Sequence, residues 1–334
     1  MSALVTGGTG FLGSHLIDLL VERGMAVKAL VRPGEDASRL RRQDVEIRWG
    51  DLSDTSSLRR ATQGVDLVFH CAARTGPWGP IAEYEAANIL GVRDLVQAAM
   101  DSGAQRIIHV SSITVHGNDV RGTANEDSPR RRESNPYSRT KVAGELLLDD
   151  MIARFHAPVT IVRPGWIYGP RDASSFGRFA SLIEQGKMVV IGSGANHVPL
   201  VYVTDVAHGM LLAATIPDAV GRTYLLVNDE PVTQREYLGA IAKELGVPAP
   251  SRHIPYRLAL ALGGTAEYAG RAIRRTQPPP LMRYGLQLAG GENVFDISRA
   301  RRELGFVPEV TLAEGVHRSV AWYKATQCVA SKEE

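Results

Sequence analysis

The chain has few of the features that mark several large classes of protein. Its 334 residues include two cysteines, Cys71 and Cys328, which are too few and too far apart for a disulfide framework, so we expect a reduced, cytoplasmic protein. Lys and Arg (38) almost balance Asp and Glu (36), which argues against nucleic acid or another polyanion as a partner. No apolar run reaches the roughly 18 residues that span a bilayer. The start, MSALVTGG, enters a strand pattern without the order of a signal peptide.

The sequence does contain alternating strand and helix patterns, as in a soluble α/β protein. Hydrophobic residues make up 44% and charged residues 22% of the chain, the usual balance of a globular protein. Strands are predicted at 3–6, 26–31, 45–48, 67–70, 106–111 and 159–163, and helices at 11–23, 81–102 and 137–155. This order predicts a Rossmann-type, doubly wound parallel sheet with helices on both faces.

After residue 163 the composition changes: Gly and Pro become frequent, and two more stretches, 233–245 and 256–274, have helical patterns. The pattern at 201–212 indicates a return to the sheet.

These patterns divide the chain into two parts. Residues 1–168 are assigned to a dinucleotide-binding domain, to which 200–228 return. Residues 169–199 and 229–330 are assigned to a smaller, mostly helical substrate lobe.

The glycine-rich stretch VTGGTGFLG lies between the first strand and the first helix. In that context Gly7 permits the tight turn, Gly10 lets the backbone approach a pyrophosphate, and Gly13 lets the helix pack closely, while the helix N-terminus faces the anion. The intervening Thr9, Phe11 and Leu12 belong to the same predicted cofactor contact.

The end of the second strand indicates which nicotinamide cofactor is used. An acidic residue there favours NAD, because it accepts the ribose hydroxyls, but this chain has Val31 followed by Arg32. A guanidinium at that place suits a 2′-phosphate, so NADP is favoured, with NAD as the alternative. Further along, Asp51 and Leu52 are expected at the adenine.

Small residues at the end of the fourth strand, Ala72 and Ala73, are expected at the cofactor's diphosphate and ribose.

The stretch NPYSRTK places Tyr137 and Lys141 one helical turn apart. Free phenols and ammonium groups have pKa values of about 10 and 10.4. An ammonium held near a phenol favours the phenolate and lowers the phenol's pKa. The pair could therefore be an acid–base catalyst, although the same spacing also occurs in ordinary exposed helix pairs.

Several motifs, taken together in their order, resemble the extended short-chain dehydrogenases/reductases. They are TGGTGFLG, GDLSD, HCAA, AANILGVRDLVQAA, VSSITVHG, YSRTK, VRPGWIYGP and PLVYVTDVA. The tail FDISRARRELGFVPEVTLAEGVHRSVAWY is similar to the branch related to 3β-hydroxysteroid dehydrogenases. The stretch ARTGPWG is similar to the sterol-decarboxylating members and to bacterial 2-alkyl-3-oxoalkanoate reductases.

The resemblance implies roles for the residues that match the family's motifs. Tyr137 would exchange a proton with the substrate oxygen, and Lys141 would bind the nicotinamide ribose and lower the pKa of the tyrosine. Ser112 would hydrogen-bond the same substrate oxygen, with Ser111 as the neighbouring alternative. Asn88 would hold the backbone near the fourth strand.

Other positions of the resemblance concern the nicotinamide and the substrate. Pro164 and Ile167 would lie near the carboxamide. Trp78, Thr114, His116 and Arg171 are candidate substrate contacts. Packing or surface positions explain Trp78 and Arg171 equally well. His116 would lie near the pocket mouth as a second proton donor, but a packed or solvated position is favoured for it. A Tyr stands at the position of His116 in the sugar-nucleotide epimerases of the family, so His116 weakens an epimerase interpretation.

The segment IPYRLALALGGTAEYAGRAIRR has a side rich in Leu and Ala and a cluster of arginines at its end. It could be a helix packed on its neighbours, an apolar lid over the substrate, or a basic amphipathic helix that touches a membrane surface.

Three functions are consistent with these patterns. The first is an NADP(H)-linked ketoreductase or alcohol dehydrogenase acting on a hydrophobic substrate, steroid-like or a β-keto or β-hydroxy acyl compound, with or without decarboxylation. The second is a nucleotide-sugar 4-epimerase or dehydratase, and the third is a non-catalytic NADP sensor. The resemblance also suggests a homodimer formed through the helices at 81–102 and 137–150. No metal site is expected.

Overall fold

A seven-stranded parallel sheet forms the centre of the computed structural model, which describes residues 1–131 and 134–330. The strand order is β12-β7-β5-β4-β1-β2-β3. The strands are β1 (Ser2–Thr6), β2 (Ala26–Val31), β3 (Glu46–Trp49), β4 (Leu67–His70), β5 (Arg106–Val110), β7 (Val159–Pro164) and β12 (Thr223–Leu226). The order reverses between β1 and β4, and ligands of such sheets bind at the carboxyl ends of the strands beside that point.

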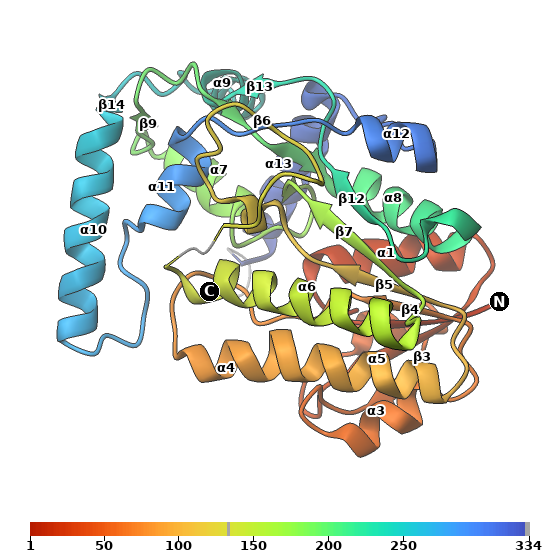
Figure 1. Cartoon of the computed structure of the whole chain (residues 1–334). Helices are drawn as coiled ribbons and strands as arrows, with labels where there is room; N and C mark the ends of the chain where they lie inside the picture. Colours follow the sequence, from red (N-terminus) through yellow and green to blue (C-terminus); the bar gives the residue numbers. More distant parts are fainter. Residues whose placement is uncertain (132–133, 331–334) are drawn as a thin grey trace.

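Helices cover both faces of the sheet, as predicted (Figure 1). One face carries α1 (Phe11–Glu22), α8 (Val203–Thr215) and α12 (Ser298–Leu304). The other carries α3 (Thr55–Thr62), α5 (Gly91–Asp101) and α6 (Pro136–Phe155). Side chains alternate across a strand, so Val5 of β1 belongs to the first core and Leu4 to the second. Burial on both faces explains why these strands read as continuous apolar runs.

The helix predicted at 81–102 is continuous to residue 101, and it consists of α4 (Ile81–Glu85), a π-helical turn η1 (Ala86–Leu90) and α5 without a break. The segment expected to return to the sheet at 201–212 is mostly α8, a helix packed on the sheet. The short strand before it, β11 (Leu200–Tyr202), pairs with β8 (Trp166–Tyr168) outside the main sheet, and β12 is the strand that returns, pairing with β7.

The rest of the chain forms a lobe over the carboxyl edge of the sheet. Its core lies among α7 (Phe176–Glu184), α9 (Gln234–Leu245) and α13 (Leu312–Ala330), around Tyr168, Tyr202 and Tyr237. Helices α10 (Tyr256–Ala272) and α11 (Arg283–Gly290) stand at the outer side of this lobe (Figure 1).

The remaining elements are short and mostly connect the larger ones. They are α2 (Ser38–Arg41), η2 (Ile113–His116), β6 (Thr123–Ala124), β9 (Val190–Ile191), β10 (His197–Val198), η3 (Pro217–Ala219), β13 (Val232–Thr233), β14 (His253–Ile254) and β15 (Val294–Phe295). Of the helices in the described part of the chain, none combines the length and apolarity needed to cross a membrane.

Candidate active site

The glycine-rich turn packs as its spacing predicts. Gly7 has a φ of 71°, a left-handed conformation that favours glycine. A Cβ on Gly13 would lie 2.2 Å from the Gly7 carbonyl oxygen, whereas a Cβ on Gly10 would approach that oxygen alone, at 3.2 Å. Gly10 also precedes α1 without a side-chain cap. The first N–H groups of α1 are therefore available to an anion such as a pyrophosphate.

Beside this turn, Arg32 is engaged by a carboxylate that the sequence analysis did not single out. Arg32 follows the buried Val31, and its Nε donates to Glu35 at 2.7 Å. The Thr9 hydroxyl donates to the same carboxylate at 2.9 Å. Glu35 therefore joins the glycine turn to the arginine proposed for the 2′-phosphate. The signal for it was its place three residues after Arg32, in the loop that follows β2.

The other predicted adenosine contacts lie in ordered turns. The Asp51 carboxylate accepts from the backbone N–H of Ser53 at 2.8 Å and from its hydroxyl at 2.6 Å, and these bonds lower the pKa of Asp51. Leu52 packs closely under the start of α5, because a Cβ on Gly91 would lie 2.9 Å from the Leu52 Cβ. A Cβ on Gly7 would lie 2.8 Å from the backbone nitrogen of Ala72, so the glycine turn and the end of β4 are in contact.

The NPYSRTK stretch forms the start of α6. The Asn135 side chain accepts from the Ser138 backbone N–H at 2.8 Å and caps the helix, and Pro136 occupies its first turn. The helix places the Lys141 ammonium 5.8 Å from the centre of the Tyr137 ring. That ammonium donates to the Val110 carbonyl at 2.8 Å, at the end of β5. Tyr137 and Lys141 are thereby fixed against the strand end that precedes Ser112.

Burial dominates the titration of both groups. It lowers the pKa of Lys141 to about 8, against an opposing effect of the Glu145 carboxylate. It raises the pKa of Tyr137, against an opposing hydrogen bond with Ser112. This is opposite to the direction expected from the Tyr–Lys pair, because the ammonium lies beside the ring and is bonded to Val110. In the protein alone, Tyr137 is therefore a protonated phenol, suited to donating a proton.

The Ser112 hydroxyl is oriented by its own local turn. Its oxygen accepts from the Thr114 backbone N–H at 3.2 Å and the Thr114 hydroxyl at 3.1 Å. With both bonds accepted, its hydrogen remains available to an oxygen in front of Tyr137. Thr114 itself is buried, so the structure makes it a support for Ser112. The Tyr284 ring packs edge-on against Tyr137, with centroids 6.3 Å apart, and sequence reasoning missed it.

Ser111 belongs to a buried ionic network behind the site. Its hydroxyl donates to the Glu145 carboxylate at 2.5 Å. Arg163 of β7 donates to that carboxylate through Nε at 2.8 Å and Nη2 at 2.6 Å, and Arg130 donates at 2.6 Å. This network joins β5, β7 and α6. The Ser111 hydroxyl is thus engaged by Glu145.

His116 lies in the same network and borders a hollow that Val120, Thr123 and Ser128 also line. It is 2% exposed, and its Nε2 lies 3.0 Å from Arg163 Nη1. Burial and the neighbouring guanidinium lower its pKa to about 4. A neutral, enclosed imidazole is a poor candidate for a second proton donor to substrate.

Two further candidates for substrate contact have other partners. Arg171 Nη2 forms an ion pair with Asp18 at 2.6 Å and Nη1 donates to Ser14 at 3.0 Å, so its charge ties the loop after β8 to α1 and is not free for an anionic substrate. The Trp78 Nε1 donates to the Arg275 carbonyl at 3.0 Å. The guanidinium of Arg271 lies 5.9 Å from the centre of the Trp78 ring. Trp78 therefore joins the loop after β4 to the end of α10.

Asn88 hydrogen-bonds the backbone of the loop after β4, as the family resemblance implied. Its Oδ1 accepts from the Arg74 backbone N–H at 2.8 Å, and its Nδ2 donates to the Arg74 carbonyl and the Thr140 hydroxyl, both at 3.0 Å. The π-helical turn thus fixes the loop after β4 to α6. A Cβ on Gly144 would lie 2.7 Å from the Asn88 carbonyl, so α6 needs glycine at that contact.

Two buried histidines near Lys141 were also missed by the sequence analysis. His70 and His109, on β4 and β5, have ring centroids 5.3 Å apart, and burial with the nearby ammonium lowers the pKa of both. Pro164 ends β7, and Ile167 lies in β8, at the carboxyl edge where the nicotinamide was predicted.

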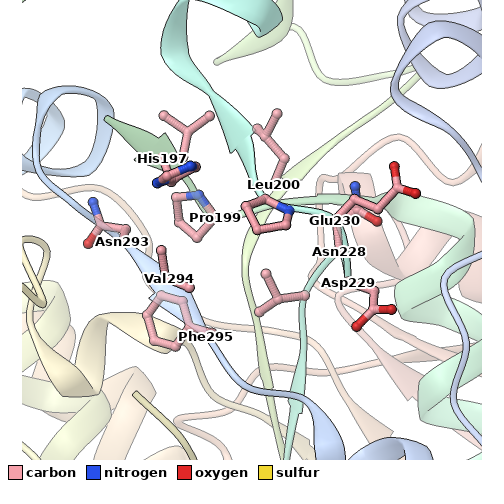
Figure 2. Close-up of a pocket in the computed structure, with 12 residues that line it drawn as sticks. His197, Pro199, Leu200, Asn228, Asp229, Glu230, Asn293, Val294 and Phe295 are labelled. Atoms are coloured by element: carbon pink, nitrogen blue, oxygen red, sulfur yellow. The ribbon is translucent and has the colours of Figure 1, made fainter. Parts of the chain in front are cut away.

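A small hollow lies in the lobe, lined by residues of β10 and β15 and of the segment that follows β12. Figure 2 shows His197 and Asn293 on one side of it and Asp229 and Glu230 on the other. None of its lining residues is a predicted site residue, so the hollow is separate from the site formed by Ser112, Tyr137 and Lys141.

Comparison with known proteins agrees with this arrangement. The sequence model of the NAD dependent epimerase/dehydratase family matches residues 3–226. A 2-alkyl-3-oxoalkanoate reductase of Stenotrophomonas maltophilia is 32% identical, over 95% of this chain and 98% of the relative. A sterol-4-alpha-carboxylate 3-dehydrogenase, decarboxylating, of Mus musculus is also 32% identical, over 95% of this chain and 89% of the relative.

Solved structures share the fold over nearly the whole chain. The crystal structure of gox2253 has a TM-score of 0.83 and is 29% identical, covering 97% of this chain and 98% of its own. UDP-glucuronic acid 4-epimerase from Bacillus cereus, in complex with NAD, has a TM-score of 0.77 at 23% identity, covering 98% of this chain and 99% of its own. At that identity the likeness concerns the fold.

Proposed function

Since the chain belongs to the NAD dependent epimerase/dehydratase family, the extended short-chain dehydrogenases/reductases, we propose that it is an NADP(H)-linked ketoreductase or alcohol dehydrogenase. Its substrate class is a hydrophobic secondary alcohol or ketone, either steroid-like or a β-keto or β-hydroxy acyl compound. The observation that carries the proposal is the convergence of Ser112, Tyr137 and Lys141 at the end of β5, on the same sheet edge as the glycine turn.

In the reductive direction each residue has one task. A bound nicotinamide supplies the hydride, which is chemistry of the cofactor. The Ser112 hydroxyl donates a hydrogen bond to the substrate carbonyl oxygen, and the Tyr137 phenol delivers the proton to that oxygen as the alcohol forms. Lys141 holds the cofactor ribose with its ammonium. Glu145 and Arg163 keep the strand ends and α6 in register.

The preference for NADP rests on the residues after β2. Val31 offers no carboxylate to the ribose, and Arg32 lies at the edge of the glycine turn. A 2′-phosphate would compete with Glu35 for the Arg32 guanidinium and form the stronger, doubly charged contact. NAD remains the alternative, in which Glu35 accepts the ribose hydroxyls.

The substrate class is supported by what the curated relatives act on and by the apolar surroundings of Tyr137. The relatives are named for 2-alkyl-3-oxoalkanoates and sterol-4-alpha-carboxylates. Tyr284 adds a second aromatic ring beside Tyr137, and such surfaces favour apolar ligands. The buried His116 and the engaged Arg171 offer no charge to a nucleotide diphosphate.

The test is a panel assay with purified protein, scanning NADPH and NADH against 2-alkyl-3-keto acids, 3-ketosteroids and UDP-sugars. The proposal expects stoichiometric NADPH oxidation with a hydrophobic ketone. Interconversion of UDP-sugars without net use of added cofactor would replace it with the 4-epimerase function. Cofactor binding without turnover of any class would favour the sensor.

A further inference from the structure

Helix α10 has its polar and apolar sides reversed. A surface helix normally buries its apolar stripe and exposes its polar one. In α10 the buried positions are Ala259, Gly263, Glu267 and Gly270. The exposed positions include Leu258, Ala261, Leu262, Thr265, Tyr268, Ala269 and Ala272. These recur at three- and four-residue intervals and so form one continuous stripe along the helix.

The exposed stripe is large and uncharged. Leu258 is 50% exposed, Leu262 43% and Tyr268 78%, and Ile273 just beyond the helix is 74% exposed. The small buried residues let α10 lie close to α11, since a Cβ on Gly263 would come within 2.8 Å of the Leu286 side chain. Helix packing therefore uses the small residues and leaves the large apolar ones outward, at the outer edge of the lobe (Figure 1).

The charges around the stripe are all of one sign. Arg257 precedes it, and Arg271, Arg274 and Arg275 follow it, all exposed. The one acidic residue of α10, Glu267, is 5% exposed and accepts from the Arg283 backbone N–H at 2.7 Å. An exposed apolar stripe flanked by arginines matches the interface of an anionic bilayer, where apolar side chains enter the acyl boundary and guanidinium groups meet phosphates.

A second copy of this helix is a poor occupant. Two stripes that faced each other would bring arginine clusters together without a compensating exposed carboxylate from α10. A free apolar ligand would not account for the arginines. We therefore propose that α10 docks this protein on the surface of a membrane that contains anionic lipid.

Docking would also orient the candidate active site. The Trp78 indole packs on Gly270 of α10, since a Cβ there would lie 3.2 Å from Cη2, and it bonds the carbonyl of Arg275. Trp78 lies in the loop that follows β4, so the membrane-facing helix and the edge of the active site are mechanically connected. A hydrophobic substrate held in the bilayer would then enter from the docked side. This route of substrate entry rests on the proposed function, whereas docking itself does not.

The experiment is vesicle flotation of the full chain without cofactor or substrate. The vesicles are pure phosphatidylcholine, or phosphatidylcholine with about a third phosphatidylglycerol. We expect binding to the anionic vesicles that weakens as salt is raised. Leu258→Gln/Leu262→Gln should lower the binding constant by about tenfold or more, whereas Phe155→Gln/Val307→Gln, which changes apolar residues that are 58% and 56% exposed elsewhere, should leave it within twofold.

A second pair of variants tests the charge. Arg257→Gln/Arg274→Gln should lower binding to anionic vesicles by at least about tenfold at low salt, because each arginine near such a surface contributes roughly fivefold. The matched control is Arg23→Gln/Arg59→Gln, two exposed arginines outside the lobe. Failure of wild type to bind anionic vesicles, or equal loss in the α10 and control variants, would overturn the proposal. Neither result would touch the reductase assay, so the two proposals fail separately.

Discussion

Helices α5 and α10 use their apolar residues in opposite ways. In α5, Val92, Leu95 and Val96 are fully buried against the sheet, so the helix serves the scaffold that holds α6 and the strand ends. In α10, Leu258 and Leu262 are exposed, and the residues on the buried side are mostly small. The apolar residues of α5 are covered by the chain's own packing. Those of α10 are left for a surface outside the chain, which we propose is an anionic membrane. Chemistry and docking are therefore carried by separate parts of the molecule.

The largest expected effect lies at the chemical centre. Tyr137→Phe removes the proton donor and leaves the cofactor contacts in place, so kcat of ketone reduction should fall by about 10² to 10⁴-fold, with the NADPH dissociation constant changed by less than a few-fold. Tyr284→Phe is the matched control, because it removes the hydroxyl of the neighbouring ring, and it should cost less than about tenfold. Near-normal turnover by Tyr137→Phe would remove that residue from the mechanism.

The stability of the fold should depend strongly on the buried ionic network of Glu145, Arg163 and Arg130. Glu145→Gln leaves Arg163, which is 1% exposed, without its carboxylate partner, and breaking such a buried pair costs about 3–5 kcal/mol of unfolding free energy. Urea unfolding measures it. Asp149→Asn is the control, since its carboxylate pairs with the same Arg130 near the surface, and it should cost less than about 1 kcal/mol. Equal stability of the two variants would show that the network does not support the fold.

The affinity for NADPH should change in opposite directions when either partner of the Arg32–Glu35 ion pair is replaced. Arg32→Ala should weaken NADPH binding by about tenfold to a hundredfold, because it removes a charge-assisted contact, and should barely change NADH. Glu35→Gln should tighten NADPH, because it frees Arg32 from its present partner. Dissociation constants for both cofactors measure this. A Glu35→Gln variant that instead loses NADH affinity would identify NAD as the cofactor and Glu35 as the ribose acceptor.

The smallest effect concerns pH. The pKa of Lys141 is lowered to about 8, so the ammonium loses its proton as pH rises through that value, and kcat/KM for reduction should decline there. Tyr137 does not account for such a decline, because its pKa is raised from the ordinary value near 10. Lys141→Arg keeps the charge at all working pH values and should lack this alkaline limb, at a reduced overall rate. A limb unchanged in Lys141→Arg would assign it to another group.

The sequence predicted the sheet and the glycine turn because both depend on local patterns. Strand–helix alternation and the glycines at 7, 10 and 13 specify a turn wherever the helix follows the strand. It did not predict Glu35, Glu145 or Tyr284, whose roles come from contacts with residues elsewhere in the chain. The partners of Arg171 and His116 were missed for the same reason, since Asp18 and Arg163 reach them only after folding.

The π-helical turn was likewise beyond pattern reasoning, as was the identity of the strand within 200–228 that joins the sheet. Asn88 sits in an ordinary amphipathic sequence, and its bonds to Arg74 and Thr140 arise from tertiary packing. Strand β12 has four residues, and it pairs with β7, a strand that is distant in the sequence.

The most direct measurement of the central claim follows a deuterium atom. NADPH that carries deuterium at both C4 positions of the nicotinamide is mixed with the protein and the best ketone of the panel, and the alcohol is analysed by mass spectrometry and NMR. The account predicts one deuterium on the carbinol carbon for each NADPH consumed, and loss of this transfer in Tyr137→Phe. Recovery of the cofactor unchanged, with no deuterated alcohol formed from any ketone and C4-epimerised UDP-sugars among the products, would contradict it.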